Sequence, residues 1–302
     1  MKQLQILKRK EIDERKWDAL INSSVDSLPY ALSHYLDAEN WEALVLNDYE
    51  AVMPLVWLRK FGFKCLYQPY YCQQLGIFSK QILNRETMKE MLVATQKFLY
   101  ININLNPSGK IIADEFSFKK KKNLLLDLNK EYSTIRKNYS ENHKRNISKA
   151  EKNELQFSED VELKQFQEFY LKNVNRKKEN FKPQHERFFK SLTKTLIANG
   201  TGKIFITKNQ KGELAAAVML LFHQNRIINI INTTSIEGKK SGASHFLFNS
   251  IIQKFSNRQN ILDFEGSSIP TIARFYEGFG AHEEIFYKYH TTLIKKLSQR
   301  FL

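Results

Sequence analysis

The sequence predicts an α/β protein of the α+β kind, made of two similar tandem domains, each a mixed, mostly antiparallel sheet flanked by helices. Three observations predict this class. The chain of 302 residues is long enough for roughly two domains. Apolar runs alternate with amphipathic stretches along its whole length. The same order of elements occurs fully after residue 118 and more weakly before it, so we expect domains over residues 1–118 and 119–302.

The first half alternates short helices with strands. Two apolar runs separated by a four-residue polar turn predict an antiparallel hairpin, and apolar spacing of three and four residues predicts a helix near residue 90. The expected helices are 14–21, 30–39 and 86–99, and the expected strands are 41–46, 51–58, 64–67 and 100–105.

The second half restarts after the four lysines at residues 119–122. Turn residues separate three consecutive apolar runs, which predicts an antiparallel meander, and a proline opens the last helix. The expected strands are 124–128, 155–158, 203–207, 214–222, 226–232, 261–264 and 285–291, and the expected helices are 132–138, 141–152, 163–173, 185–198, 241–255 and 270–278.

The composition excludes several classes of protein. With 42% hydrophobic and 26% charged residues, 11 Gly and 6 Pro, the chain is neither disordered nor collagen-like. Its two cysteines, Cys65 and Cys72, are too few for a disulfide framework or a four-ligand zinc site, and its histidines lack paired ligand spacing, so we expect a cytoplasmic protein without bound metal. The longest apolar run has nine residues, against about 20 for a spanning helix. We therefore expect at most peripheral membrane contact.

The net charge of +15 is unevenly distributed. Residues 119–203 contain 21 Lys and Arg against 11 Asp and Glu. Such a surface attracts anions, such as coenzyme phosphates, RNA or an anionic lipid or sugar-phosphate carrier. A genome rich in Lys, Ile and Asn codons is an equally good explanation of the composition by itself.

The junction between an apolar strand and an amphipathic helix, near residue 240, is a candidate phosphate site. Glycines there allow main-chain N–H groups to face a ligand, and a helix N-terminus and two lysines add positive charge. A plain turn with Ser241 as the helix cap is the alternative. The candidate residues are Ser235, Gly238, Lys239, Lys240, Ser241, Gly242, Ala243 and Ser244.

Two carboxylates and a tyrosine form a second candidate. In a regular strand Asp263 and Glu265 share one face, where mutual proximity would raise one pKa, as a general base for an amine requires. A solvated face or a salt bridge to the basic helices is the alternative. Tyr276 lies one position from Phe275, an expected core residue, and could present its hydroxyl to a cleft. A structural tyrosine is the alternative there.

Two further clusters are candidates for substrate contacts. Aromatic and amide side chains are concentrated in residues 67–74, and such side chains suit the binding of a sugar or peptide acceptor. An edge strand with half-buried tyrosines explains them equally well. Helix 141–152 places basic residues on one face, which fits a phosphate-binding stripe or a solvated surface. The candidate residues are Tyr67, Tyr70, Tyr71, Gln73, Gln74, Arg145 and Lys149.

The element order, the strand-to-helix junction and Ala273-Arg274-Phe275-Tyr276-Glu277-Gly278-Phe279-Gly280 resemble the acyl-CoA N-acyltransferase (GNAT) superfamily. With Leu262-Asp263-Phe264-Glu265-Gly266-Ser267 and residues 145–152, the chain is similar to the double-domain branch of Fem-type peptidoglycan-bridge aminoacyltransferases. The resemblance spans most of residues 120–290 and, more faintly, the first half.

This resemblance implies that an amine attacks an activated acyl group in the cleft of a splayed sheet. It implies that Lys239, Gly242 and Ser244 occupy positions one, four and six of the phosphate loop, that Tyr276 protonates a departing thiolate, and that Glu265, or Asp263 through water, removes a proton. Fem-type enzymes usually carry Lys where this chain has Tyr276, a departure that favours a thioester donor over aminoacyl-tRNA.

The resulting hypothesis is a cytoplasmic N-acyltransferase that uses acyl-CoA as co-substrate and acylates the amine of a small-molecule, sugar, peptide or lipid-linked cell-envelope precursor. Two alternatives stay open. One is a Fem-type transferase that takes its acyl group from aminoacyl-tRNA and acts on a peptidoglycan precursor. The other is a non-catalytic module that binds an anionic partner through the same fold.

Overall fold

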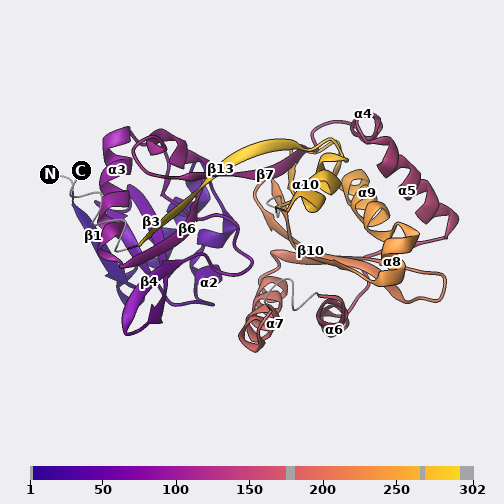
Figure 1. Cartoon of the computed structure of the whole chain (residues 1–302), viewed down its shortest axis with the longest axis horizontal. Coiled ribbons are helices and arrows are strands. Elements are labelled where there is room, and N and C mark those ends of the chain that lie inside the picture. Colours follow the sequence, from indigo (N-terminus) through magenta and orange to yellow (C-terminus); the bar gives the residue numbers. More distant parts are fainter. Residues whose placement is uncertain (1–2, 175–180, 266–268, 293–302) are drawn as a thin grey trace. The chain divides into compact units, whose positions relative to one another are not determined.

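The computed structural model describes residues 3–174, 181–265 and 269–292 (Figure 1). Contacts divide the chain into two compact units. The first contains the described residues up to Lys122 and those from Ile285 on, and the second contains Asn123–Glu284. The division falls four residues after the expected boundary at 118/119. The last strand, expected in the second domain, belongs by its contacts to the first unit, because it pairs with a strand of that unit.

The strands of the first unit form a mixed sheet in the order β1-β2-β3-β4-β6-β13, with β5 paired to β3, and β13 belongs to this unit from Ile285 on. Its neighbouring strands are antiparallel except for the parallel pair β4 and β6. The strands are β1 (Leu4–Lys8), β2 (Trp41–Leu46), β3 (Ala51–Lys60), β4 (Phe63–Tyr67), β5 (Phe78–Ser79), β6 (Tyr100–Leu105) and β13 (His282–Thr292), and the α-helices are α1 (Glu14–Ser23), α2 (Ser33–Leu36) and α3 (Arg85–Ala94).

The local sequence explains most of these elements. Asp13 caps α1 and Asn84 caps α3 through their side chains. Met91 and Leu92 of α3 are buried in the same core as Leu55 and Ile101 of the sheet. Two expectations fail here. The expected helix at 30–39 is α-helical only over Ser33–Leu36, and β1 was not expected.

The second unit contains a mixed sheet in the order β7-β12-β11-β10-β9-β8. Helices α4, α5, α9 and α10 cover one face, and α6 and α7 lie on the other (Figure 1). The strands are β7 (Lys119–Asp127), β8 (Gln156–Ser158), β9 (Gly202–Lys208), β10 (Leu214–His223), β11 (Arg226–Thr234) and β12 (Ile261–Asp263); the α-helices are α4 (Tyr132–Lys137), α5 (Glu141–Lys152), α6 (Leu163–Asn173), α7 (Pro183–Ala198), α8 (Ile236–Ser241), α9 (Ala243–Phe255) and α10 (Pro270–Glu277).

The predicted meander is β9-β10-β11, antiparallel throughout. The expected helix at 241–255 begins earlier, because Ser235 caps the separate short helix α8, and the left-handed Gly242 (φ 82°) then separates α8 from α9. Within the described ranges no helix is long and apolar enough to cross a bilayer.

Candidate active site

Strands β11 and β12 diverge in the middle of the second sheet. They pair in parallel only over Arg226–Ile228 and Ile261–Asp263, after which β12 ends and β11 continues to Thr234. A bulge opposite Met219 and Leu220 leaves Ile230 without a partner on β10 at the point of divergence. The pairing between β11 and β12 therefore ends beside the residues that the sequence predicted as catalytic.

The Tyr276 hydroxyl lies at this divergence. The ring is buried and stacks on Phe264 with centroids 4.5 Å apart. The hydroxyl oxygen accepts hydrogen bonds from the side-chain amides of Asn229 (2.8 Å) and Asn232 (3.2 Å), and the Asn229 amide also donates to the Phe264 carbonyl (3.1 Å). Because both amides donate, the hydroxyl keeps its own proton for another acceptor. Burial raises the pKa of Tyr276 to about 12, so the group is a protonated donor at neutral pH.

The two asparagines were missed by sequence reasoning. Asn229 and Asn232 are three residues apart, and a regular strand would put them on opposite faces of the sheet. The bulge at Ile230 shifts the register by one and brings both amides to the same hydroxyl. Their signal in the sequence was two amides among the isoleucines of the strand 226–232, which begins with Arg226.

Asp263 and Glu265 are in different surroundings. Asp263 is buried and pairs with Arg226 (Oδ2 to Nη1, 3.0 Å), which also pairs with Glu284 (3.2 Å). Burial raises the pKa of Asp263 although Arg226 opposes this shift. The alternative of a salt bridge is therefore realised for Asp263, but with Arg226 of the neighbouring strand and not with the basic helices.

Glu265 lies beyond the strand. The expected strand 261–264 ends at Asp263, and Glu265 has a left-handed backbone (φ 50°). The alternation of side chains along a strand, which predicted both carboxylates on one face, therefore does not apply to Glu265. Its main-chain N–H donates to Asp263 Oδ1 (3.1 Å). Burial raises the pKa of Glu265 well above its usual range. The negative charge of Glu265 in turn raises the pKa of Tyr276. Burial therefore favours the protonated form of Glu265 relative to that of an ordinary glutamate.

The predicted phosphate loop is the helix α8 and its junction with α9. Its glycines serve close packing: a Cβ on Gly238 would lie 2.1 Å from the Ala215 carbonyl oxygen, and one on Gly242 would lie 2.5 Å from that of Asn146. The N–H of Gly238 bonds to the Ser235 hydroxyl and that of Lys239 to the Ser235 carbonyl. The glycines therefore do not leave an open cradle of main-chain amides.

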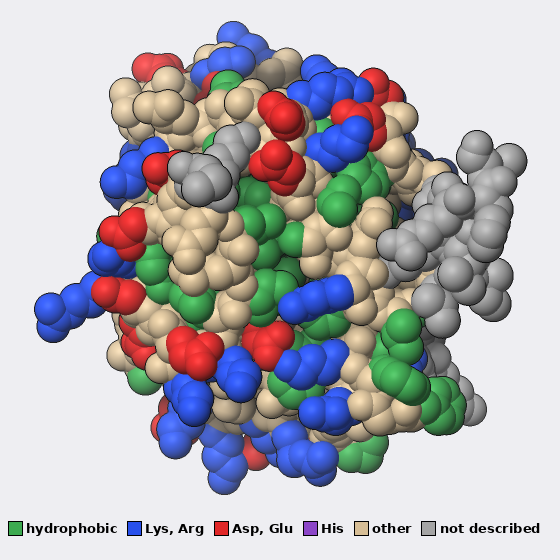
Figure 2. Space-filling view, turned by 90° about the vertical axis from the view of Figure 1, so that its left-hand side faces the viewer, with side chains coloured by type: hydrophobic (Ala, Val, Ile, Leu, Met, Phe, Trp, Pro, Cys, Tyr) green, Lys and Arg blue, Asp and Glu red, His purple; other side chains and the backbone are tan. Residues whose placement is uncertain are grey.

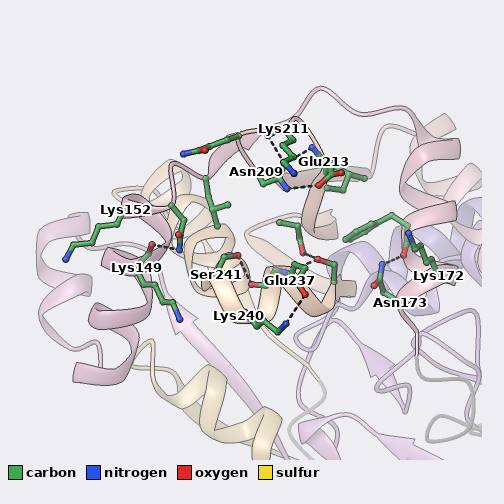
Figure 3. Close-up of a pocket in the computed structure, with 18 residues that line it drawn as sticks. Lys149, Lys152, Lys172, Asn173, Asn209, Lys211, Glu213, Glu237, Lys240 and Ser241 are labelled. Atoms are coloured by element: carbon green, nitrogen blue, oxygen red, sulfur yellow. Dashed lines mark hydrogen bonds and ion pairs between the residues drawn. The ribbon is translucent and has the colours of Figure 1, made fainter.

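The outer side of the same junction borders a cavity of about 850 Å³ (Figure 3). Four of the eight predicted cofactor-binding residues line it: Ser235, Gly238, Lys240 and Ser241. The other four, Lys239, Gly242, Ala243 and Ser244, do not; Lys239 is exposed, Gly242 and Ala243 are buried, and the Ser244 hydroxyl bonds to Thr234.

Positive charge dominates this basic cavity. Five lysines from four elements line it against two glutamates, Glu213 and Glu237. Among these five, in the part of the chain that is described, only Lys240 forms an ion pair, with Glu237 (2.9 Å). The lysines are Lys149, Lys152, Lys172, Lys211 and Lys240. Such a set of charges attracts anions, and Phe169 and several amide side chains also line the cavity.

The basic face of α5 continues from this cavity. Arg145, Lys149 and Lys152 are exposed, and they line a second cavity of about 400 Å³. Lys149 and Lys152 border both cavities. The predicted substrate residues Arg145 and Lys149 therefore lie beside the predicted phosphate site.

The aromatic and amide cluster belongs to the first unit. Tyr67 is half-buried and hydrogen-bonds to Glu39, Tyr70 is 36% exposed, and the Tyr71 carbonyl accepts from the Tyr35 hydroxyl. Gln74 is buried; its amide nitrogen donates to Gln73 (2.7 Å), and its amide oxygen has no described partner. Part of the cluster is thus committed to internal bonds. Its role toward a substrate stays a prediction.

Comparison with known proteins supports this geometry. Residues 137–265 match the family model of the acetyltransferase (GNAT) domain. The structure of FemX covers 98% of this chain and 99% of its own (TM-score 0.68, 12% identity). A conserved protein of unknown function from Bacteroides thetaiotaomicron covers 96% and 100% (TM-score 0.60, 10% identity), and L-PGS from Bacillus licheniformis covers 92% and 91% (TM-score 0.54, 14% identity). No curated protein matches by sequence.

Residues 137–265, which lie within the second unit, are therefore similar to an acetyltransferase (GNAT) domain. Across almost its whole length the chain has the fold of FemX. The predicted resemblance to the double-domain Fem-type branch of the superfamily is confirmed in its fold. Over the described ranges, no group of three or more His, Cys, Asp or Glu side chains is arranged to hold a metal ion.

Proposed function

We propose that the protein is an N-acyltransferase that moves an acyl group from acyl-CoA to the amine of a cell-envelope, sugar or peptide precursor. The observation that carries the proposal is the Tyr276 hydroxyl, which two amides hold at the divergence of β11 and β12. The likeness to FemX and to the C-terminal domain of a putative lysylphosphatidylglycerol synthetase from Agrobacterium fabrum (TM-score 0.56, 12% identity) supports the choice of a cell-envelope acceptor.

Each side chain has one task in this reaction. Lysines of the basic cavity bind the phosphates of the donor. Glu265 accepts a proton from the amine as the new C–N bond forms. Main-chain N–H groups of β11 beyond Ile228, which β12 no longer pairs, stabilise the oxyanion. Tyr276 gives its proton to the sulfur as the C–S bond breaks.

A second donor is favoured by a specific observation. Lys149 and Lys152 border two adjacent cavities, so the basic surface is longer than one pyrophosphate requires. A string of phosphates such as the acceptor end of an aminoacyl-tRNA also fits this surface. In that case the Tyr276 proton goes to the departing ribose oxygen.

Titration calorimetry with coenzyme A tests the choice of donor. We expect saturable binding, and Lys152→Gln with Lys240→Gln should weaken it about tenfold or more, since a charge-assisted hydrogen bond contributes about 1.5–3 kcal/mol. Lys239→Gln is the matched control, because Lys239 is exposed on the same short helix but does not line the cavity. Gly242 is a poor probe because any side chain there collides with α5.

Binding of tRNA alone, with affinity falling steeply as salt rises, would identify the second donor. If neither coenzyme A nor tRNA binds, or if Lys239→Gln weakens binding as much as the cavity variants, the assignment of the basic cavity is wrong.

Glu265→Gln should have opposite effects on activity and stability. Because burial raises the pKa of Glu265, the folded state binds this proton more tightly than the unfolded state does. The stability that this proton contributes is complete at low pH and is lost as pH rises through the folded pKa. Glutamine stays neutral at every pH. At pH 8 the variant should therefore melt about 2–4 °C higher than the wild type, which corresponds to roughly 1 kcal/mol in the free energy of unfolding. At pH 4 the two melting temperatures should differ little.

Activity should fall about 10²-fold or more in the same variant, because the base is removed. The wild-type kcat/KM should decline on the acid side with an apparent pKa well above that of an ordinary glutamate, and the variant should lose this limb. An unchanged pH profile would exclude Glu265 as the base.

A further inference from the structure

The hairpin between β3 and β4 ends in an exposed aromatic tip. Phe61 is 98% exposed and Phe63 is 57% exposed. Lys60 pairs with Phe63, so the loop consists of Phe61 and Gly62 alone. Both have positive φ angles, 49° and 81°, which are the signature of the mirror-image turns of two-residue hairpins.

This turn is chemically unusual. Its first position favours Asn, Asp or Gly, because other side chains are strained at positive φ. Phe61 is therefore unfavourable for the turn and gains nothing from burial in this fold. Two exposed phenylalanines at such a tip indicate that a surface outside this fold covers them when the protein binds to it.

Basic side chains surround the tip. Arg59 and Lys60 precede it, Lys64 follows it, and the Arg59 guanidinium donates to the Gly62 carbonyl (2.9 Å). Lys8 and Lys10 join Arg59 and Lys64 around a neighbouring cavity of about 700 Å³.

Three acids line this cavity against five basic residues. Asp37 pairs with Arg9, Glu42 pairs with Lys64, and Glu39 hydrogen-bonds to Tyr67. Lys8, Lys10, Arg59 and Lys60 have no ion-pair partner within the described chain. Figure 2 shows Lys and Arg side chains gathered over the lower part of the face on the side of the first unit, with hydrophobic side chains among them.

We propose that the β3–β4 hairpin docks the protein on a lipid bilayer that contains anionic lipids. Phe61 and Phe63 enter the boundary between headgroups and acyl chains, and Lys8, Lys10, Arg59 and Lys60 bind the lipid phosphates. Two aromatic rings alone bind a neutral membrane weakly, so the charges are required. The inference is independent of the proposed reaction, because its test uses neither donor nor acceptor.

Co-sedimentation of the full chain with vesicles tests the proposal. We expect binding to phosphatidylcholine vesicles with 30% phosphatidylglycerol, little binding to phosphatidylcholine alone, and release at 500 mM salt. Phe61→Asn with Phe63→Thr should weaken binding at least tenfold. Asn suits the turn, so the melting temperature should stay the same or rise, which separates loss of docking from loss of folding. Ile82→Asn, at another apolar residue (75% exposed) of the same unit, should change nothing.

A charge-reversal variant provides a second test of the docking proposal. Lys60→Glu should weaken binding to the anionic vesicles, and Lys80→Glu, an exposed lysine away from the hairpin, should have a much smaller effect. The tryptophan fluorescence of the Phe61→Trp variant should shift to shorter wavelength only when anionic vesicles are present. The proposal is overturned by equal binding to neutral vesicles, by absence of binding, by full binding of the tip variant, or by self-association in solution that the tip variant abolishes.

Discussion

Tyr276→Phe is expected to lower kcat by about 10²–10³-fold with the acyl donor, because it removes the proton donor for the leaving group. The loss of fold stability should be small, on the order of 1 kcal/mol, since the Asn229 amide keeps its bond to the Phe264 carbonyl. Steady-state kinetics and thermal melting measure the two effects separately. KM for the donor should change little, because the Tyr276 side chain does not line the basic cavity.

Tyr139→Phe is the matched control. Tyr139 is buried in the same core and contacts Phe279, but its hydroxyl has no hydrogen-bond partner among the described residues. Removing this hydroxyl should leave turnover unchanged and stability equal or slightly higher. A Tyr276→Phe enzyme that keeps more than half of the wild-type kcat would exclude the assigned role.

Arg226→Leu is expected to have the largest effect on stability, about 3–5 kcal/mol, because it leaves a buried carboxylate without its cation. Arg226 is the shared partner of Asp263 and Glu284, and Asp263 is 2% exposed. Urea unfolding measures the loss. Burial already raises the pKa of Asp263, so the deficit should shrink at low pH, where this group takes up a proton in the folded state.

Two variants control for this effect. Arg226→Leu combined with Asp263→Asn should recover much of the stability, since no buried charge then lacks a partner. Arg9→Leu also removes an arginine that pairs with two acids, Glu14 and Asp37, but these are exposed and the cost should be about 1 kcal/mol or less. Equal losses for Arg226→Leu and Arg9→Leu would show that burial of Asp263 does not matter.

The site was only partly predictable from the sequence, because it depends on a bulge in β11 and on the end of β12 at Asp263. The sequence pattern indicated Tyr276 and Glu265 as candidates, since each lies beside a recognisable core or strand motif. It did not indicate Asn229 and Asn232, because a one-residue bulge cannot be read from strand periodicity. It paired Asp263 with Glu265, because alternation assumes that the strand continues, whereas β12 ends at Asp263.

The glycine junction shows a different limit. Gly238 and Gly242 were correctly located at the start of a helix, but their purpose was misread. Only the packing of α8 against β10 and α5 shows that a Cβ would collide with main-chain carbonyls there. We therefore propose that phosphates bind not at the glycines but at the lysines that four separate elements bring together.

The sequence by itself determined most of the element order, the α/β class and the excess of positive charge, because these depend on local periodicity and composition. Only the tertiary structure decided which side chains meet: Tyr276 with two asparagines, Asp263 with Arg226, and five lysines around one cavity. It also decided that the last strand pairs with the first unit. These contacts join residues far apart in the chain, and their register depends on bulges, strand ends and close packing that no local pattern encodes.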